Sequence, residues 1–321
     1  MATAHYSHPA CRTHEMGRGH PESPQRLDAI ADHLIATGLD ELLLKREAPA
    51  ATEAELKLAH DAGYVAELLG FLDQVEAGGR LRALDADTTA GPGTREAVLR
   101  AAGAARAATD AVLDGEVANA FCAVRPPGHH ATRRQAMGFC FVNNVVLAAR
   151  HALERRGLER VAIVDFDVHH GNGTEDIVAN DPRILMLGFF QHPLYPGSGV
   201  VPLGPNVHNF PVPPYTKGAE IRPRVEAEWL PRLEALRPQM LFVSAGFDAH
   251  RDDDLGQMGL VEADYAWMTR LLMDVAERHA RGRIVAVLEG GYNLGALARS
   301  VAAHLRVLAG VAAVEAGPAA R

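Results

Sequence analysis

The sequence contains few cysteines, and their scarcity argues against a disulfide-stapled protein. Three occur in 321 residues, at Cys11, Cys122 and Cys140, and no two of them form a CxxC pair. An odd, sparse set of this kind is typical of reduced thiols in a cytosolic protein rather than of a disulfide framework. We therefore expect a cytoplasmic protein whose cysteines are small core side chains.

Long apolar runs and blocks of basic residues are also missing. No apolar stretch reaches membrane-spanning length, and the first twenty residues contain no signal-peptide core. The formal net charge is -8, from 40 acidic and 32 basic residues, without a long Lys/Arg block. Strong binding to nucleic acid or to an anionic membrane is not expected from such a charge distribution.

The short motifs of several large enzyme classes do not occur either. The chain has no GxGxxG, no GxxxxGK[ST] and no GxSxG. Their absence disfavours a dinucleotide-binding enzyme, a P-loop nucleotide hydrolase and a serine hydrolase of the nucleophile-elbow type.

What the chain does contain is an alternation of apolar runs and amphipathic stretches. Near-continuous apolar runs predict strands at residues 120–125, 160–168, 183–190, 240–247 and 283–290. Amphipathic stretches predict helices at 94–115, 143–157, 219–238 and 262–282, with more helix around 24–38 and 53–72. This alternation predicts an α/β fold, a single domain (residues 1–310) with a central parallel β-sheet flanked by helices on both faces. Residues 311–321 are expected to be a flexible C-terminal tail.

Chemically capable residues follow four of the predicted strands. The segments are RPPGHH (125–130), DFDVHHGNG (165–173), SAGFDAH (244–250) and LEGGYN (288–293). Ligand sites of open parallel sheets lie beyond the carboxyl ends of the strands. We therefore expect the four segments to form one site.

The segment DFDVHHGNG carries the strongest metal-binding pattern. Asp165, Asp167 and His169 are spaced by two, which places them on one side of an extended strand. Buried carboxylates need a partner, and a metal ion can supply it. A salt-bridged or capping cluster is the simpler alternative for a lone DxD, but the adjoining His169-His170 pair and glycine turn favour the metal.

Asp248 and His250, in SAGFDAH, are competing candidates for a further ligand. Taken alone, Asp248 is more often a helix cap or turn residue. Two carboxylates, one imidazole and an open position would suit a catalytic zinc ion, which acidifies its bound water.

Three further residues have positions that suit catalysis. His129 and His130 follow an apolar strand and a stiff Pro-Pro-Gly turn, as a general base would, although surface histidine pairs commonly have no such role. Tyr292 follows two glycines and could donate to an oxyanion, although a loop tyrosine usually only packs. Phe139 and Tyr195 could line an apolar channel.

The five motifs RPPGHH, GFCFVNN (138–144), DFDVHHGNG, SAGFD and LEGGYN, in this order, resemble the histone deacetylase family. HPESPQR (20–26) further resembles its class II branch and bacterial deacetylase-like amidohydrolases. The resemblance runs from about residue 5 to about residue 305. It implies the arginase–deacetylase fold, which in this family has a central parallel sheet of about eight strands.

The resemblance also implies the metal site and the reaction. One zinc ion per chain would be held by Asp167, His169 and Asp248, and His250 would not be a ligand. We expect hydrolysis of the amide of an N-acylated amine, with His130 as general base and acid and His129 tuning the pair electrostatically.

The other site residues are likewise carried over by resemblance. Tyr292 corresponds to the oxyanion-stabilising tyrosine. Asp165 would orient His129 and help to hold a structural K⁺, and Asn172 would orient His130. Gly188 departs from the family pattern, because relatives usually carry a serine there whose side chain contacts the K⁺.

A substrate tunnel is implied by a further group of residues. Gly138, Phe139 and Tyr195 match its wall, where Tyr195 replaces the more frequent phenylalanine, and Arg26 matches a basic residue of an inner acetate-release channel. Leu255 falls where relatives specialised for acetylpolyamines carry a glutamate.

Leu255 bears on the choice of substrate. A leucine cannot attract a second ammonium group, which favours acyl-lysine peptides over acetylpolyamines. The neighbouring acids at 252–254 could attract the group instead, but three adjacent acids are more often a solvated turn.

The expected partners are therefore an acylated protein or peptide, or an acetylated small amine, with no nucleic acid and no membrane. The sequence is compatible with a monomer or a homo-oligomer. An acetylpolyamine amidohydrolase is the main alternative. An arginase-like ureohydrolase needs two metals and a DAHxD pattern that FDAHRDD matches only superficially, and a non-catalytic acyl-lysine binder would be expected to have lost a site residue.

Overall fold

Eight parallel strands form the central sheet of the computed structural model, which describes residues 2–311. Their order is β2-β1-β5-β10-β9-β6-β7-β8, and every neighbouring pair is parallel. The strands are β1 (Thr3–Ser7), β2 (Leu43–Glu47), β5 (Asn119–Cys122), β6 (Val161–Asp165), β7 (Ile184–Gln191), β8 (Val207–Val212), β9 (Leu241–Ala245) and β10 (Ile284–Leu288). A separate antiparallel pair joins β3 (Arg82–Ala83) to β4 (Thr89–Ala90).

The five apolar runs are confirmed as strands β5, β6, β7, β9 and β10. These five strands are neighbours inside the sheet, in the order β5-β10-β9-β6-β7, and each consists entirely of buried residues. The apolar runs did not predict β1, β2 and β8. Strands β2 and β8 are the sheet edges and are partly exposed, so their sequences mix polar and apolar residues.

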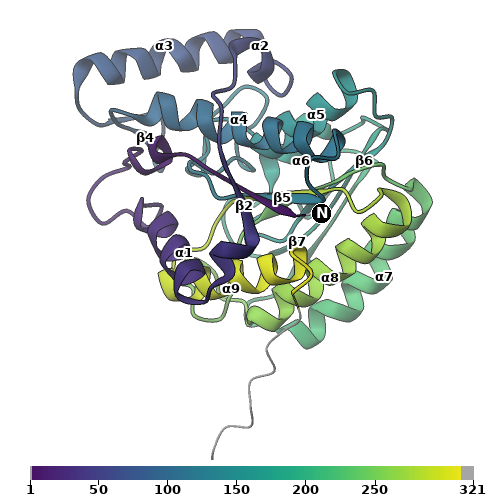
Figure 1. Ribbon diagram of the computed structural model, residues 1–321. Coiled ribbons are helices and arrows are strands. Elements are labelled where there is room, and N and C mark those ends of the chain that lie inside the picture. The colour runs from purple at the N-terminus through teal and green to yellow at the C-terminus, as the bar shows by residue number, and fades with distance from the viewer. Residues whose placement is uncertain (1, 312–321) are drawn as a thin grey trace, which may run out of the picture.

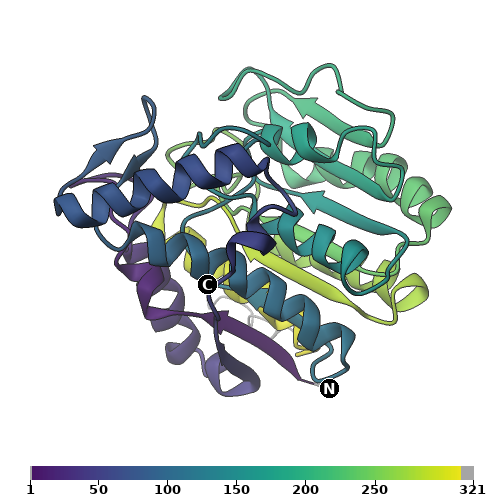
Figure 2. The same ribbon diagram turned by 90° about the horizontal axis from the view of Figure 1, so that it is seen from above.

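Helices cover the sheet in two layers (Figure 1). One layer contains α4 (Thr94–Leu113), α5 (Asn144–Glu154) and α6 (Asn172–Val178), with α2 (Glu53–Leu56) and α3 (Ala62–Gly78) outside it. The other contains α1 (Gln25–Ala36), α7 (Gly218–Leu236), α8 (Glu262–His279) and α9 (Leu294–Leu308). Short 3₁₀ turns occupy Pro9–Arg12 and Leu39–Leu42. Seen from above, the layer with α3, α4 and α5 lies in front of the strands (Figure 2).

All six predicted helical stretches contain helices, the one at 53–72 as the two helices α2 and α3, but α6 and α9 were not predicted. Both begin in or next to a motif that the sequence had singled out for chemistry: α6 begins at Asn172 of DFDVHHGNG, and α9 begins directly after LEGGYN. Helix α9 is capped by Asn293, whose side chain accepts from the amide of Ala296 at 3.0 Å. Helix α5 is capped in the same way by Asn143, at 3.1 Å from the amide of Val146, as expected for an N-cap.

The single α/β domain with helices on both faces of a parallel sheet is thus confirmed. The predicted flexible tail falls almost wholly on residues 312–321, which lie outside the described residues. Within residues 2–311, none of the helices is both long and apolar enough to cross a lipid bilayer. All four chemically distinctive segments lie at the carboxyl ends of strands β5, β6, β9 and β10.

Candidate active site

Three buried side chains at this edge form a group suited to a metal ion. Asp167 and His169 lie on the bend after β6, and Asp248 follows β9. One potential ligand atom from each lies within 4.8 Å of the others. The Nδ1 atom of His169 is 3.0 Å from Oδ1 of Asp167 and 3.2 Å from Oδ2 of Asp248. Within residues 2–311 no other group of this kind is found.

The electrostatics of this group favour a bound cation. Burial and the neighbouring Asp167 raise the pKa of Asp248 to about 7. Against the effect of burial, Asp167 and Asp248 raise the pKa of His169 to about 10. The two carboxylates therefore share the positive charge of His169, and within residues 2–311 no group donates a hydrogen bond of good geometry to the buried Oδ2 of Asp248. The donor set fits a divalent ion such as zinc.

Two glycines of the motifs make room for the carboxylates. A Cβ atom on Gly246 would lie 2.0 Å from Oδ2 of Asp167, and one on Gly290 would lie 2.0 Å from Oδ2 of Asp248. The amide of Gly290 also donates to Oδ2 of Asp167 at 2.9 Å. A larger residue at either position would therefore collide with a candidate ligand.

The residues of DFDVHHGNG are arranged differently from the predicted extended strand. Strand β6 ends at Asp165, and Asp167 and His169 lie on a bend rather than on one side of a strand. Asp165 is not part of the metal group and instead contacts His129. The rival candidate His250 is also outside the group, because its Nδ1 accepts from the amide of Asp252 at 3.1 Å.

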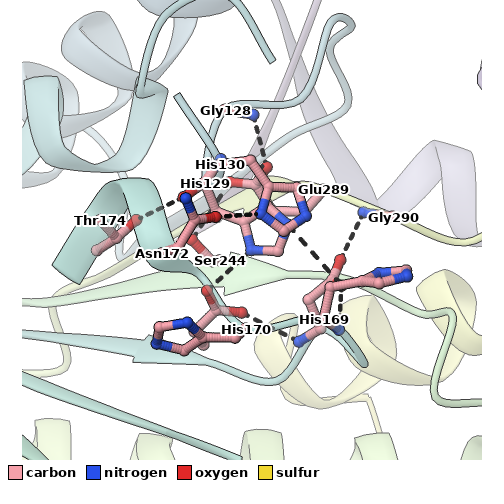
Figure 3. Close-up of polar contacts among 12 residues, drawn as sticks. Gly128, His129, His130, His169, His170, Asn172, Thr174, Ser244, Glu289 and Gly290 are labelled. Carbon is pink, nitrogen blue, oxygen red and sulfur yellow. Dashed lines mark hydrogen bonds and ion pairs between the residues drawn. The ribbon is translucent and has the colours of Figure 1, made fainter. Parts of the chain in front are cut away.

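The tandem histidines lie next to the metal group, each with its own partner. The Nδ1–H of His129 donates to Oδ2 of Asp165 at 3.0 Å, and that of His130 donates to Oδ1 of Asn172 at 2.7 Å. The two ring centroids are 4.0 Å apart. Figure 3 shows the imidazoles side by side, with Asn172 at one end of the group. A neutral imidazole with Nδ1–H leaves Nε2 free to accept a proton.

The two imidazoles differ in charge preference. Burial disfavours a charged His129, but Asp167 and Asp165 outweigh burial and raise its pKa well above the usual value. For His130, burial and the neighbouring cations His129 and His169 lower the pKa well below the usual value. The carboxylates Asp167 and Asp165 thus favour the imidazolium at His129, whereas burial and the neighbouring positive rings keep His130 neutral.

A hollow of about 220 Å³ leads from the surface to these groups. The predicted tunnel residues Gly138, Phe139, Tyr195 and Leu255 all line it, as does Tyr292. At its inner end lie His129, His130 and His169. The rest of the wall is formed by Asp87, Pro127, Leu194 and Gly290. The hollow can accept a slender apolar chain whose end reaches the metal group.

Arg26 does not line this hollow. It is fully buried, and its guanidinium donates to the carbonyl oxygens of Gly291 at 2.7 Å and Glu289 at 2.5 Å. It also pairs with Glu22 at 3.1 Å, and its Cζ lies 5.0 Å from the centre of the Tyr292 ring. In this structure Arg26 therefore supports the segment that carries Tyr292.

Sequence reasoning missed Asp253, which it assigned to a solvated turn. Asp253 is buried, and its Oδ2 accepts from the amides of Tyr292 at 2.6 Å and Asn293 at 3.0 Å. Its Oδ1 accepts from the amide of Leu255 at 3.0 Å. One carboxylate thus ties two parts of the hollow's wall together. The other two acids are exposed, as predicted: Asp252 contacts Arg299 at 3.3 Å, and Asp254 has no hydrogen-bond partner among the described residues.

Glu289 was also missed, although an acid ending a wholly apolar strand could have revealed it. It is buried, and its Oε2 accepts from the amides of Gly128 at 2.7 Å and His129 at 3.1 Å (Figure 3). Ser244 donates to its other oxygen at 3.2 Å. Burial, partly offset by His129, raises the pKa of Glu289 to about 7. Glu289 therefore holds the backbone of the tandem histidines.

Gly188 lies beside Asp165, where β6 pairs with β7. A Cβ atom at this position would lie 2.8 Å from Oδ1 of Asn209 and 3.1 Å from the carbonyl oxygen of Asp165. The Oδ1 atom of Asn209 is buried and has no hydrogen-bond partner among the described residues. A side-chain oxygen thus occupies the space that a larger residue at 188 would need.

Comparisons with known proteins agree with this geometry. The histone deacetylase domain matches residues 20–308. The histone deacetylase-like amidohydrolase of Pseudomonas aeruginosa is 40% identical over 282 residues, covering 86% of this chain and 73% of its own. Mouse polyamine deacetylase HDAC10 is 40% identical over 306 residues, which cover 90% of this chain and 45% of its own. The crystal structure of the HDA15 HD domain superposes with a TM-score of 0.88 at 34% identity, covering 97% of this chain and 89% of that one.

Proposed function

Because the chain belongs to the histone deacetylase family, we propose that it is a zinc-dependent deacetylase that hydrolyses the amide of an N-acylated lysine or a related amine. The observation that carries the proposal is the buried Asp167, His169 and Asp248 group at the inner end of an apolar hollow, next to two differently partnered histidines. These three residues would hold the ion. When bound, zinc would polarise the acyl carbonyl and acidify a water molecule.

The chain's own residues have separable tasks in this proposal. His130 takes a proton from the attacking water at Nε2, because Asn172 occupies its Nδ1–H and its environment keeps the ring neutral. It then returns the proton to the leaving amine. His129, paired with Asp165, stays positively charged beside it and stabilises the negative charge that develops.

Tyr292 supplies a hydrogen-bond donor to the developing oxyanion. Its ring lines the hollow beside Phe139, with ring centroids 6.0 Å apart. Its backbone is anchored by Asp253, and Arg26 lies against its ring. The hydroxyl is therefore pre-positioned, which is what makes an oxyanion donor effective.

The metal assignment is tested by metal analysis of purified variants. We expect about one zinc per chain in the wild type and a large loss in Asp248→Ala. His250→Gln is the matched control, because His250 is buried nearby but outside the group. Full zinc occupancy in Asp248→Ala, with loss in His250→Gln, would overturn the ligand set.

For the substrate, we propose acyl-lysine peptides ahead of acetylpolyamines. Leu255 lines the hollow and adds apolar wall, and Asp253 is engaged by three backbone amides rather than turned to a ligand. The matched polyamine deacetylase HDAC10 makes acetylpolyamines the specific alternative. A kcat/KM panel of both substrate classes decides between them, and Leu255→Glu should shift the ratio toward acetylspermidine. A wild-type preference for acetylpolyamines would contradict the proposal.

We also propose a structural K⁺ beside Asp165, with Oδ1 of Asn209 taking the part of the serine hydroxyl that Gly188 lacks. The unpartnered buried oxygen of Asn209 supports this assignment. We expect KCl to raise the melting temperature more than NaCl at equal ionic strength, and Asn209→Leu to abolish the difference. An equal response to both salts in the wild type would exclude a selective site.

A further inference from the structure

A second hollow, of about 370 Å³, lies at the opposite edge of the sheet from the candidate active site. It is formed where the chain enters β6, β9 and β10, which are neighbours in the sheet. These strands are five residues long, so roughly 17 Å of strand separates the two edges. Five arginines line this hollow: Arg160, Arg237, Arg278, Arg281 and Arg283.

The positive charge of this arginine hollow is only partly neutralised. Arg278 pairs with Glu234 at 2.6 Å, and Arg160 pairs with Glu159 at 3.2 Å. The same Glu234 also contacts His279 in the lining, at 2.6 Å. Within residues 2–311 the other three arginines have no carboxylate partner. The hollow is thus positively charged in a chain whose net charge is -8.

The unpaired arginines are also held in unfavourable surroundings. Burial and the neighbouring Arg281 lower the pKa of Arg283, because a second guanidinium nearby disfavours its charge. Arg237 and Arg281 have φ angles of 53° and 55°, in the left-handed region that favours glycine. Both follow the end of a helix, where glycine is the usual solution. The chain thus retains Arg237 and Arg281 where the backbone disfavours a side chain, and Arg283 where a second guanidinium disfavours its charge.

The loops that carry the arginines are bound to one another. The amide of Gln239 donates to the carbonyl of Arg160 at 2.8 Å, and the side chain of Gln239 accepts from the amide of Arg160 at 3.1 Å. The amide of Leu241 donates to the carbonyl of Arg283 at 3.1 Å. A ligand would therefore meet guanidinium groups on a firmly held backbone.

We propose that the arginine hollow binds a small molecule that carries a chain of phosphates. A guanidinium presents a fork of donors that matches phosphate oxygens, and adjacent phosphates can engage several forks at once. At roughly 30 Å³ per water molecule, the hollow has room for about a dozen waters, more than one orthophosphate would displace. Bound phosphates offset the repulsion between Arg281 and Arg283. The site is separate from the tunnel and does not depend on the proposed deacetylase activity.

The probe is inorganic triphosphate, titrated into the zinc-loaded protein by calorimetry and thermal unfolding. Millimolar triphosphate should raise the melting temperature by a few degrees, because a ligand that binds only the folded state stabilises it. Sodium chloride at equal ionic strength should not. ATP is run in parallel: equal affinity assigns recognition to the phosphates alone, and tighter binding of ATP adds a contact to the nucleoside. Zinc content is measured after each titration, because phosphate chains also chelate zinc.

Variants separate this site from general anion effects. Arg281→Gln and Arg283→Gln should each weaken triphosphate binding at least about tenfold, since each removes a charge-assisted contact. Arg270→Gln is the matched control: Arg270 is exposed, lies outside the lining and has no ion-pair partner within residues 2–311, so its loss should change affinity less than twofold. Equal affinity in all three variants and the wild type, or no binding by the wild type, overturns the proposal.

A further variant guards against loss of folding in the glutamine substitutions. Arg237→Gly removes a guanidinium and relieves a positive φ, so it should unfold at a higher temperature without ligand and respond less to triphosphate. An undiminished response would contradict the proposal. Competition between triphosphate and an acetyl-lysine peptide would also contradict it, because that result would locate the anion in the tunnel.

Discussion

Asp253→Ala should damage catalysis more than its distance from the reaction would suggest. The substitution removes the acceptor of three backbone amides, those of Leu255, Tyr292 and Asn293. A hydrogen bond to a charged group contributes about 1.5–3 kcal/mol, and partial access of water reduces the loss, so we expect destabilisation of about 3–5 kcal/mol. Displacement of Tyr292 by about 1 Å would lower kcat roughly 10²-fold.

Asp253→Asn separates geometry from charge. Its amide oxygen can still accept from Tyr292 and Asn293, and only the Leu255 contact is lost. We therefore expect destabilisation of about 1–2 kcal/mol and a kcat within about tenfold of the wild type.

The assays are urea unfolding, zinc content and kcat and KM on an acetyl-lysine peptide, with Asp254→Ala as control. Asp254 is exposed, so its loss should change stability by less than about 0.5 kcal/mol. A folded, zinc-loaded Asp253→Ala enzyme with kcat within threefold of the wild type would refute the positioning role. Equal damage in Asp254→Ala would show that the acids act through their charge.

Three further outcomes follow from the site. Tyr292→Phe should keep its zinc and melting temperature but lose about 10²–10³ in kcat, and near wild-type turnover would rule out the oxyanion role. His130→Ala should lower kcat more than His129→Ala, and equal activity in both variants would show that neither transfers the proton. The third outcome concerns Glu289, whose pKa in the folded protein is raised to about 7. Its protonated carboxyl stabilises the folded state fully below the unfolded pKa near 4.5, and this stabilisation is lost as the pH rises through 7. Glu289→Gln keeps an acceptor for Gly128 and His129 and should remove up to roughly 3 kcal/mol of that pH dependence, measured by urea unfolding; an unchanged profile would mean that Glu289 does not titrate there.

Most of the interior strands of the sheet could be predicted from the sequence because both of their faces are buried. Strands β6, β7, β9 and β10 are covered on both faces, so each must be a continuous apolar run that stands out in the sequence. The edge strands β2 and β8 are partly exposed and have no such constraint. Helix α6 follows the glycine turn within a chemical motif, and its seven residues are too few to show a periodic pattern.

The sequence also indicated that the candidate site residues would lie together. Asp167, His169 and Asp248 follow apolar strands, and the parallel order of those strands brings their ends together. The spacing argument placed Asp165, Asp167 and His169 together on one side of a strand, whereas β6 ends at Asp165 and only the other two belong to the metal group. It is the bend after the strand, with room made by Gly246 and Gly290, that turns the ligands toward each other.

By itself the sequence determined the fold class and the edge of the sheet that carries the chemistry, because burial and strand order impose patterns along the chain. The set of candidate metal ligands came from the resemblance of its motifs to a known family. Only the tertiary structure decided which partner each side chain meets. It placed Asp253 under three amides instead of in solvent, bound Arg26 to the Tyr292 segment outside the tunnel, and joined three loops into an arginine hollow. Such contacts join residues far apart in sequence, and local pattern carries no information about them because their geometry is set by packing of the whole domain.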